Sequence, residues 1–149
     1  MEEAGQTAAW GNAVLNLSKR TQLGLYVLVE LVNDDRDQRS NEELATSLEV
    51  SVNHLAKVMQ TLGRVGWIVG SRGVGGGYRM IADPKNISMA DVVAVFEGEP
   101  NLDDCSLAKG ERCDEVAECT IHRVIHEIEE QAYFTLKSVT LHMLAQSGG

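Results

Sequence analysis

The sequence predicts a mainly α-helical fold with a small β-hairpin wing: a winged helix-turn-helix followed by a long C-terminal dimerisation helix. Three observations lead to this prediction. Two short helical segments, each preceded by a serine cap, are separated by only a few residues. A glycine-rich hairpin pattern follows the second segment directly, in the position of a wing. The C-terminal segment then repeats apolar residues at helical spacing over about three heptads.

The composition is that of an ordinary globular protein, with 44% hydrophobic and 23% charged residues among 149. No run of about 18 apolar residues could form a membrane-spanning helix, so we expect no membrane partner. Residues 1–10 are small and acidic and lack the basic start and apolar core of a secretory signal. We therefore expect a cytoplasmic protein.

The net charge of −9 at first argues against nucleic-acid binding. Residues 15–82, however, contain 8 Lys and Arg against 7 Asp and Glu, whereas residues 83–149 contain 5 against 13. The acidic charge is thus concentrated in the C-terminal half. Because a locally basic face can bind phosphates on an anionic protein, DNA binding by the N-terminal half remains possible.

The chain divides into four predicted parts: a flexible tail (1–16), a winged helix-turn-helix DNA-binding domain (17–98), a cysteine loop that binds a cluster (99–120) and a dimerisation helix (121–146). The first helix is expected over Leu17–Val32, where leucines and valines form one apolar stripe. A polar loop separates it from Ser40, which begins a capping box with Glu43 and starts a short second helix.

The third helix and the hairpin follow within a few residues. Ser51 caps this helix, and Gly66 ends it because glycine readily adopts the left-handed conformation of a helix C-terminus. Short strands are expected at 67–69 and 78–81, on either side of a glycine-rich turn. A second capping box at Ser88 then starts a further helix.

The last predicted element is one continuous helix over about 120–146. Its apolar residues recur every three or four positions, at Ile121, Ile125, Ile128, Ala132, Leu136, Val139 and Met143. A helix this long cannot easily bury such a stripe on a small domain, so pairing with a second copy is the favoured interpretation. The alternative is a helix packed back on its own core.

The second helix of a helix-turn-helix enters the major groove with its N-terminal residues at the base edges. Serine, asparagine and histidine can bond base edges or phosphates, lysine suits a phosphate, and wing arginines suit a narrow minor groove. The expected DNA contacts are Ser51, Asn53, His54 and Lys57 from the helix, and Arg72, Gly73, Gly76, Gly77 and Arg79 from the wing. The alternative is an ordinary flexible turn with solvated arginines.

Three cysteines and a histidine form a second group, Cys105, Cys113, Cys119 and His122. Thiolates hold iron–sulfur clusters, and imidazole can replace some of them. Zinc also accepts three cysteines and one histidine, although the Cys-x2-Cys knuckle common in structural zinc sites is absent. A thiol redox switch without metal is the remaining alternative.

Segments 53–58, 62–68 and 72–80 read NHLAKV, LGRVGWI and RGVGGGYRM. Together with the downstream cysteines they resemble the Rrf2 family of bacterial transcription regulators, over Leu17 to about Leu144. Its best-known branches are the iron–sulfur-cluster assembly regulator and the nitric-oxide-sensing repressor. The resemblance implies a homodimer on double-stranded, partly palindromic operator DNA, with the long helix as the dimer element.

The resemblance also implies an iron–sulfur cluster, 2Fe-2S in first place and 4Fe-4S in second, held by the three cysteines. His122 matches the fourth ligand of the assembly branch. Two departures stand out. The gap between Cys105 and Cys113 is longer than in the family pattern. Gln22 occupies the position where the nitric-oxide branch can carry an acidic ligand, and glutamine is a poor ligand.

We therefore expect a sequence-specific transcription regulator, a repressor, whose DNA binding responds to nitric oxide, redox or iron–sulfur status through a cluster. One alternative is a winged-helix regulator with a zinc site or thiols alone. Another is a small iron–sulfur electron carrier or cluster-transfer protein, which leaves the basic helix and wing unexplained. No enzymatic activity is expected, because Gly73–Gly77 lacks the Lys-Ser/Thr of a phosphate-binding loop and no catalytic constellation occurs.

Overall fold

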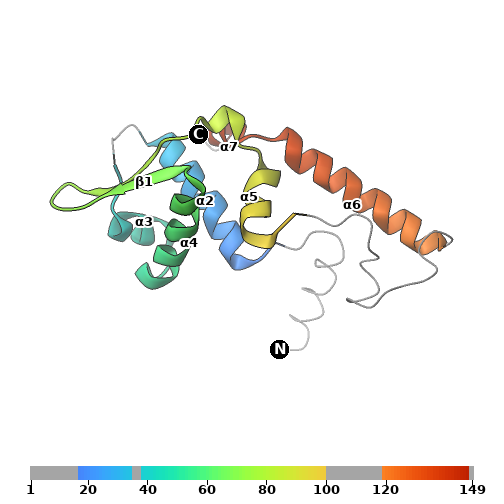
Figure 1. Ribbon diagram of the computed structural model, residues 1–149, viewed down its shortest axis with the longest axis horizontal. Helices are drawn as coiled ribbons and strands as arrows, with labels where there is room; N and C mark the ends of the chain where they lie inside the picture. Colours follow the sequence, from blue (N-terminus) through green and yellow to red (C-terminus); the bar gives the residue numbers. More distant parts are fainter. Residues whose placement is uncertain (1–16, 35–37, 100–118, 148–149) are drawn as a thin grey trace.

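The computed structural model describes residues 17–34, 38–99 and 119–147. The described part is mainly α-helical with one small antiparallel hairpin, which confirms the predicted fold class (Figure 1). Its elements are α2 (Lys19–Asn33), α3 (Asn41–Leu48), α4 (Val52–Val65), β1 (Ile68–Ser71), β2 (Gly77–Met80), η1 (Pro84–Asn86), α5 (Met89–Glu97), α6 (Thr120–Ser138) and α7 (Leu141–Ser147). The tail predicted at 1–16, together with Cys105 and Cys113, lies outside the described residues.

The core forms where α2, α3 and α4 pack together, as their apolar stripes predict. Its fully buried side chains include Val27, Leu28, Leu44, Leu55, Val58, Met59 and Leu62. Burying each large apolar side chain contributes about 1.5–3 kcal/mol to the free energy of unfolding. The stripe of α4 therefore holds its inner face on the domain and leaves the outer face free.

Local capping fixes the helix-turn-helix as predicted. Ser40 Oγ accepts the Glu43 N–H at 3.1 Å, and the Glu43 carboxylate accepts the Ser40 N–H at 3.2 Å. Glu49 ends α3 in the left-handed conformation, with φ 55°. Ser51 caps α4, and Gly66 ends it at φ 92°. Each cap satisfies backbone groups that a helix end leaves unpaired, so the two helices keep a tight connection.

The hairpin, called the wing below, consists of β1, β2 and residues 72–76. Its strands start and end within two residues of the predicted positions, and Val69 lies opposite Arg79. The structure adds an isolated β-bridge to this two-stranded sheet, which the sequence pattern did not predict. Arg39 donates its N–H to Tyr78 O at 2.9 Å and accepts the Tyr78 N–H at 2.7 Å. The segment that leads into α3 therefore borders the wing.

The single helix predicted over 120–146 is wrong in one respect, because it is interrupted at Val139 and Thr140. Val139 is extended, with φ −101° and ψ 120°, and its carbonyl accepts the Met89 N–H at 2.8 Å. The Leu141 N–H donates to Ile87 O at 2.9 Å. These bonds to the start of α5 replace helical ones. The chain then continues as α7, which packs against α2 and buries Leu141.

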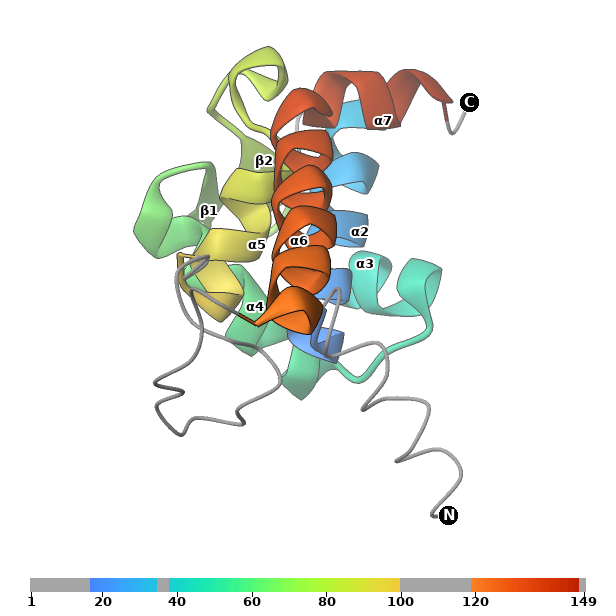
Figure 2. The same ribbon diagram turned by 90° about the vertical axis from the view of Figure 1, so that its right-hand side faces the viewer.

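Helix α6 extends away from the body, opposite the end that carries the wing (Figure 1). Seen from its own side of the molecule, α6 stands in front of α2 and beside α5 (Figure 2). Several of its apolar side chains are exposed, among them Ile121, Val124, Ile128 and Phe134. A protein rarely leaves such a stripe in water unless it has a binding partner. Among the residues that the structure describes, no helix has both the length and the apolar character to cross a membrane.

Candidate nucleic-acid interface

The first turn of α4 presents polar side chains to solvent. Ser51, Asn53 and Lys57 are exposed, and His54 is half-buried. Ser51 Oγ accepts the His54 N–H at 3.1 Å, which leaves its hydroxyl hydrogen free to donate to a phosphate. Leu55 on the opposite side is fully buried and fixes the direction of this turn. The geometry suits a helix whose N-terminus faces DNA.

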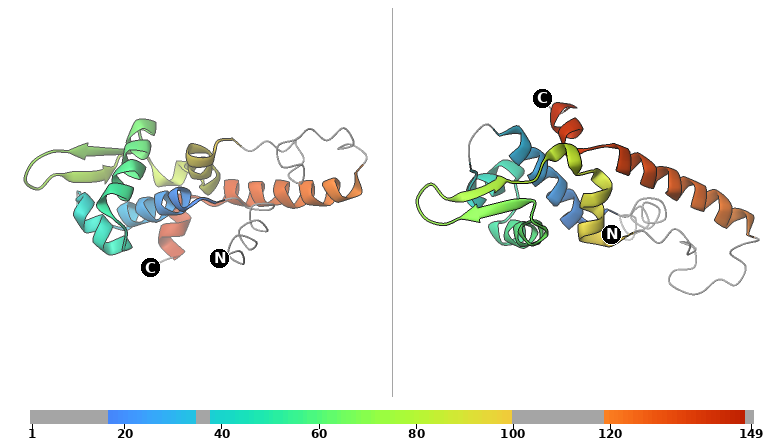
Figure 3. Two further views of the ribbon diagram at one scale, coloured as in Figure 1. Left: turned by 90° about the horizontal axis from the view of Figure 1, so that it is seen from below. Right: turned by 45° about the horizontal axis from the view of Figure 1, so that its top comes forward.

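The wing carries the second set of predicted contacts. Arg72 precedes the turn and Arg79 lies on β2, and both are exposed. The hairpin projects from the same end of the molecule as α3 and α4, as two directions of view agree (Figures 1 and 3). The exposed arginines and the exposed turn of α4 can therefore approach one DNA duplex together.

The wing glycines have structural reasons of their own. Gly73 and Gly75 have φ of 96° and 79°, which glycine adopts without steric cost. A Cβ at Gly76 would lie 2.5 Å from Ser71 O. A Cβ at Gly77 would lie 2.6 Å from the carbonyl carbon of Arg39, so only glycine allows the bridge between Arg39 and Tyr78. A DNA contact by Gly73, Gly76 or Gly77 remains a prediction beside these roles.

The start of α6 brings together the described part of the cysteine group. Cys119 caps the helix, and its Sγ accepts the His122 N–H at 3.5 Å. His122 is only 8% exposed, which does not fit a plain surface histidine. Its ring stacks on that of His126 with centroids 5.7 Å apart, and His126 in turn pairs with Glu130 at 3.2 Å.

His122 Nδ1 is buried and has no hydrogen-bond partner, and the same holds for His126 Nδ1. A buried polar atom without a partner is costly, and bonding to a metal would relieve that cost. A cysteine sulfur and a neutral imidazole one turn apart are ligands that iron and zinc both accept. In the described part of the chain no three metal-binding side chains come together, and the other two cysteines lie outside it. The two described residues fit a metal group without identifying it.

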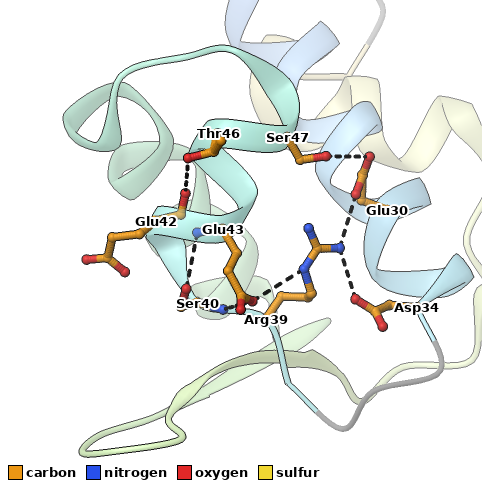
Figure 4. A network of polar contacts seen from close by, with 8 residues as sticks. All are labelled: Glu30, Asp34, Arg39, Ser40, Glu42, Glu43, Thr46 and Ser47. Carbon is orange, nitrogen blue, oxygen red and sulfur yellow. Dashed lines mark hydrogen bonds and ion pairs between the residues drawn. The ribbon is translucent and has the colours of Figure 1, made fainter.

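Two further polar residues were not singled out from the sequence. Glu97, at the end of α5, accepts the Ser18 N–H at 3.0 Å and a hydrogen bond from the Thr21 hydroxyl. Arg39 forms ion pairs with acidic residues of α2 and α3 (Figure 4). Neither contact has a local sequence signal, because the partners of Glu97 are more than 70 residues away and Arg39 lies in a polar loop.

Comparison with known proteins bears directly on this arrangement. Residues 17–147 match the Rrf2 family model, which is described as an iron-dependent transcriptional regulator. The chain belongs to the Rrf2 family. It is therefore a helix-turn-helix transcription regulator and not an enzyme. The predicted DNA contacts of this Rrf2 protein lie on the exposed α4 turn and the wing.

Rrf2 relatives cover most of the chain. It is 37% identical over 130 residues to BadM of Rhodopseudomonas palustris, whose name describes an HTH-type transcriptional regulator. That match covers 87% of this chain and 81% of BadM. It is 31% identical over 134 residues to the HTH-type transcriptional regulator NsrR of Bacillus subtilis, covering 89% of this chain and 92% of NsrR.

Solved structures of the Rrf2 type share the fold. IscR of T. potens superposes with a TM-score of 0.71 at 20% identity, over 91% of this chain and 89% of that one. CymR of B. subtilis, described as the global cysteine regulator, superposes with a TM-score of 0.69 at 24% identity, over 89% and 98%. At these identities the likeness supports the winged-helix architecture alone.

Proposed function

We propose that this chain is a homodimeric repressor whose binding to a partly palindromic operator is controlled by an iron–sulfur cluster. The observation that carries the proposal is the separation of two sites along one molecule. The basic α4 turn and the wing lie at one end, and the Cys119–His122 pair lies at the far end of α6 (Figure 1). The family description as iron-dependent supports a metal at the second site.

The proposed ligands are Cys105, Cys113, Cys119 and His122, with 2Fe-2S as the first choice of cluster and 4Fe-4S as the second. The cluster would supply a group that reacts with oxidants and nitric oxide. Within the chain, Cys119 caps the first turn of α6, and His122 offers its unpartnered Nδ1.

At the DNA end, Ser51, Asn53, His54 and Lys57 would enter the major groove, and Arg72 and Arg79 would follow the minor groove. The exposed stripe of α6 would pair with a second copy and set the separation of two recognition helices. Operator half-sites require a fixed separation, so a change at α6 would alter affinity.

The decisive experiment is anaerobic purification with iron, sulfide and zinc analysis and an absorption spectrum. We expect stoichiometric iron and sulfide in the unmodified protein and altered spectra in His122→Ala. His126→Ala is the matched control, because it removes the neighbouring ring of the stacked pair and should leave cluster content unchanged. Unmodified protein with neither iron nor sulfide would refute the cluster.

A thiol-based or zinc regulator is the second candidate. It is favoured by the structural likeness to CymR proteins, one of which, from Staphylococcus aureus, is described in an oxidised form. Zinc without sulfide, or DNA binding that changes with thiol oxidation in metal-free protein, would support it.

An electron carrier, the alternative from another class, would not bind DNA, so a DNA-binding measurement distinguishes it from a regulator. Lys57→Ala and Arg72→Ala should each weaken binding to a selected duplex and reduce its salt dependence by about one released counterion.

A further inference from the structure

Arg39 is attached to the wing through its backbone. Its N–H and C=O both pair with Tyr78, at 2.9 and 2.7 Å, so residue 39 forms an isolated antiparallel bridge to β2. The neighbouring Gln38 side chain contacts the Ser71 hydroxyl at the end of β1. The absence of a side chain at Gly77 is what lets residue 39 approach β2. A shift of residue 39 would therefore move the part of the hairpin next to its turn.

The side chain of Arg39 points the other way, into the junction of α2 and α3 (Figure 4). Its Nη1 lies 2.9 Å from Asp34 Oδ2 and 3.1 Å from Glu30 Oε2. Its Nε lies 3.6 Å from Glu43 Oε2, the carboxylate that also completes the capping box with Ser40. One guanidinium thus connects the end of α2 to the start of α3.

The same network reaches the far end of α3. Glu30 accepts a hydrogen bond from the Ser47 hydroxyl at 3.1 Å with its other carboxylate oxygen. Helix α3 is therefore held to α2 near both ends, at Ser47 and, through Arg39, at Glu43 (Figure 4). This is the helix that precedes the recognition helix in the helix-turn-helix.

The Arg39 side chain is only 11% exposed and serves three carboxylates. A buried ion pair adds little net stability, because desolvation offsets the attraction, but it favours one geometry over its alternatives. The planar fork of arginine can meet several carboxylates at once, which a lysine ammonium cannot do in the same geometry. Since its charge is already matched by acidic partners, Arg39 is not itself suited to bind phosphate.

We propose that Arg39 is a positioning residue for operator binding, which fixes the wing relative to the helix-turn-helix. Its backbone holds β2 and its side chain holds α2 and α3, so the separation between Arg72 on the wing and Lys57 on α4 depends on it. The inference rests on the proposed DNA-binding function. Arg39 touches no DNA and acts through the wing.

A double-mutant cycle tests this inference. The probe is a duplex selected from a randomised library by the unmodified full-length protein. We expect Arg39→Ala to weaken binding on the order of tenfold, the scale of losing one good groove contact. In an Arg72→Ala background the same change should cost less than about twofold, because the wing contact is already lost. In a Lys57→Ala background the cost should again be about tenfold.

Two variants separate positioning from general damage. Arg39→Lys keeps the charge without the fork and should give an intermediate loss. It also replaces Arg39→Ala in the cycle if the alanine variant does not fold. Lys85→Ala, on η1, removes one positive charge outside the proposed interface and should change affinity less than about twofold. All measurements are made below the unfolding temperature of every variant.

Equal losses in the Arg72→Ala and Lys57→Ala backgrounds, or no loss in the single variant, would overturn the positioning role while leaving DNA binding intact. If the unmodified protein selects no duplex, the proposed function fails and the role of Arg39 fails with it. The two failures are thus distinguishable in one series of measurements.

Discussion

Gly24 of α2 lies directly against the ring of Phe96 in α5. A Cβ atom at Gly24 would lie 2.8 Å from Phe96 Cζ, closer than real side chains come. Gly24 is buried in the middle of its helix, where glycine is otherwise unfavourable. The close crossing of α2 and α5 is therefore the reason for glycine at this position.

We expect Gly24→Ala to lower the free energy of unfolding. Forcing an extra methyl into a packed site costs about 1–3 kcal/mol, and the better helix propensity of alanine returns about 1 kcal/mol. Gly63→Ala is the matched control, because a Cβ at Gly63 in α4 meets nothing within 4 Å. It should stabilise by up to about 1 kcal/mol. Chemical denaturation measures the change in the free energy of unfolding for both variants, and the two changes should have opposite signs. Equal changes would contradict the conclusion that the contact with Phe96 requires glycine at position 24.

Ser51 and Ser88 cap different helices with equal geometry. Their hydroxyls accept the N–H of His54 and Asp91, each at 3.1 Å. Either serine replaced by alanine should lose about 1 kcal/mol of stability. Only Ser51→Ala should weaken operator binding, since Ser88 starts α5. Ser51→Asp keeps a cap but places a negative charge toward phosphate, so it should bind DNA still less well. Equal DNA affinities for Ser51→Ala and Ser88→Ala would show that Ser51 does not contact the operator.

Glu97 should make stability depend on pH. Partial burial alone would raise the pKa of Glu97, but hydrogen bonds from Ser18 and Thr21 and the charge of Arg20 outweigh it, so the pKa is lowered. The folded state then favours the carboxylate. Its contribution is present above the ordinary glutamate pKa and is lost as the pH falls through the lowered value.

Unfolding of wild type and Glu97→Gln across acidic pH tests this contribution. The stability difference between them should be constant at neutral pH and shrink on acidification. Thr21→Val, which keeps size and removes the donor, should reduce the pH dependence without abolishing it. A difference that does not vary with pH would show that Glu97 acts without its charge.

The exposed stripe on α6 should control oligomeric state. Ile128 is 42% exposed, and Ile121 is 63% exposed on the same helix. Ile128→Glu should weaken self-association at least about tenfold, because a charge would be buried at the seam. Ile81→Glu is the control, since Ile81 is an equally exposed isoleucine after β2. Sedimentation velocity over a concentration series measures the monomer–dimer equilibrium of both variants. An unchanged dimer in Ile128→Glu would show that the interface does not include this part of α6.

Local signals predicted much of this fold because they act within a few residues. The capping boxes at Ser40 and Ser88 and the stop at Gly66 depend only on residues within a few positions of each other, and all three are present. The break in the helix at Val139 could not be predicted locally, because no glycine or proline lies beside it. It arises from hydrogen bonds to Ile87 and Met89, about 50 residues away in sequence, which no local pattern encodes.

In the candidate site, too, some features could be predicted from the sequence and others could not. Exposure of Asn53 and Lys57 followed from the apolar stripe on the other side of α4. The burial of His122 did not, because the apolar stripe predicted for this helix passes through Ile121 and Ile125 and does not include His122. Arg39 gave no signal either, because an arginine in a polar loop is ordinarily solvated. Only the fold brings Glu30 and Tyr78 to opposite sides of it.

The interruption at Val139–Thr140 leaves α6 as a straight helix that is fixed to the domain at its C-terminal end. Its C-terminal end is pinned to the start of α5 by two backbone hydrogen bonds, and its 19 residues span roughly 28 Å at 1.5 Å per residue. A displacement of about 2 Å at Cys119 then corresponds to a rotation of only about 4° at the pin. The rotation would act first on α5, whose Phe96 lies against Gly24 of α2. A change at the start of α6 would thus have a continuous path of contacts to the helix that packs against α3 and α4.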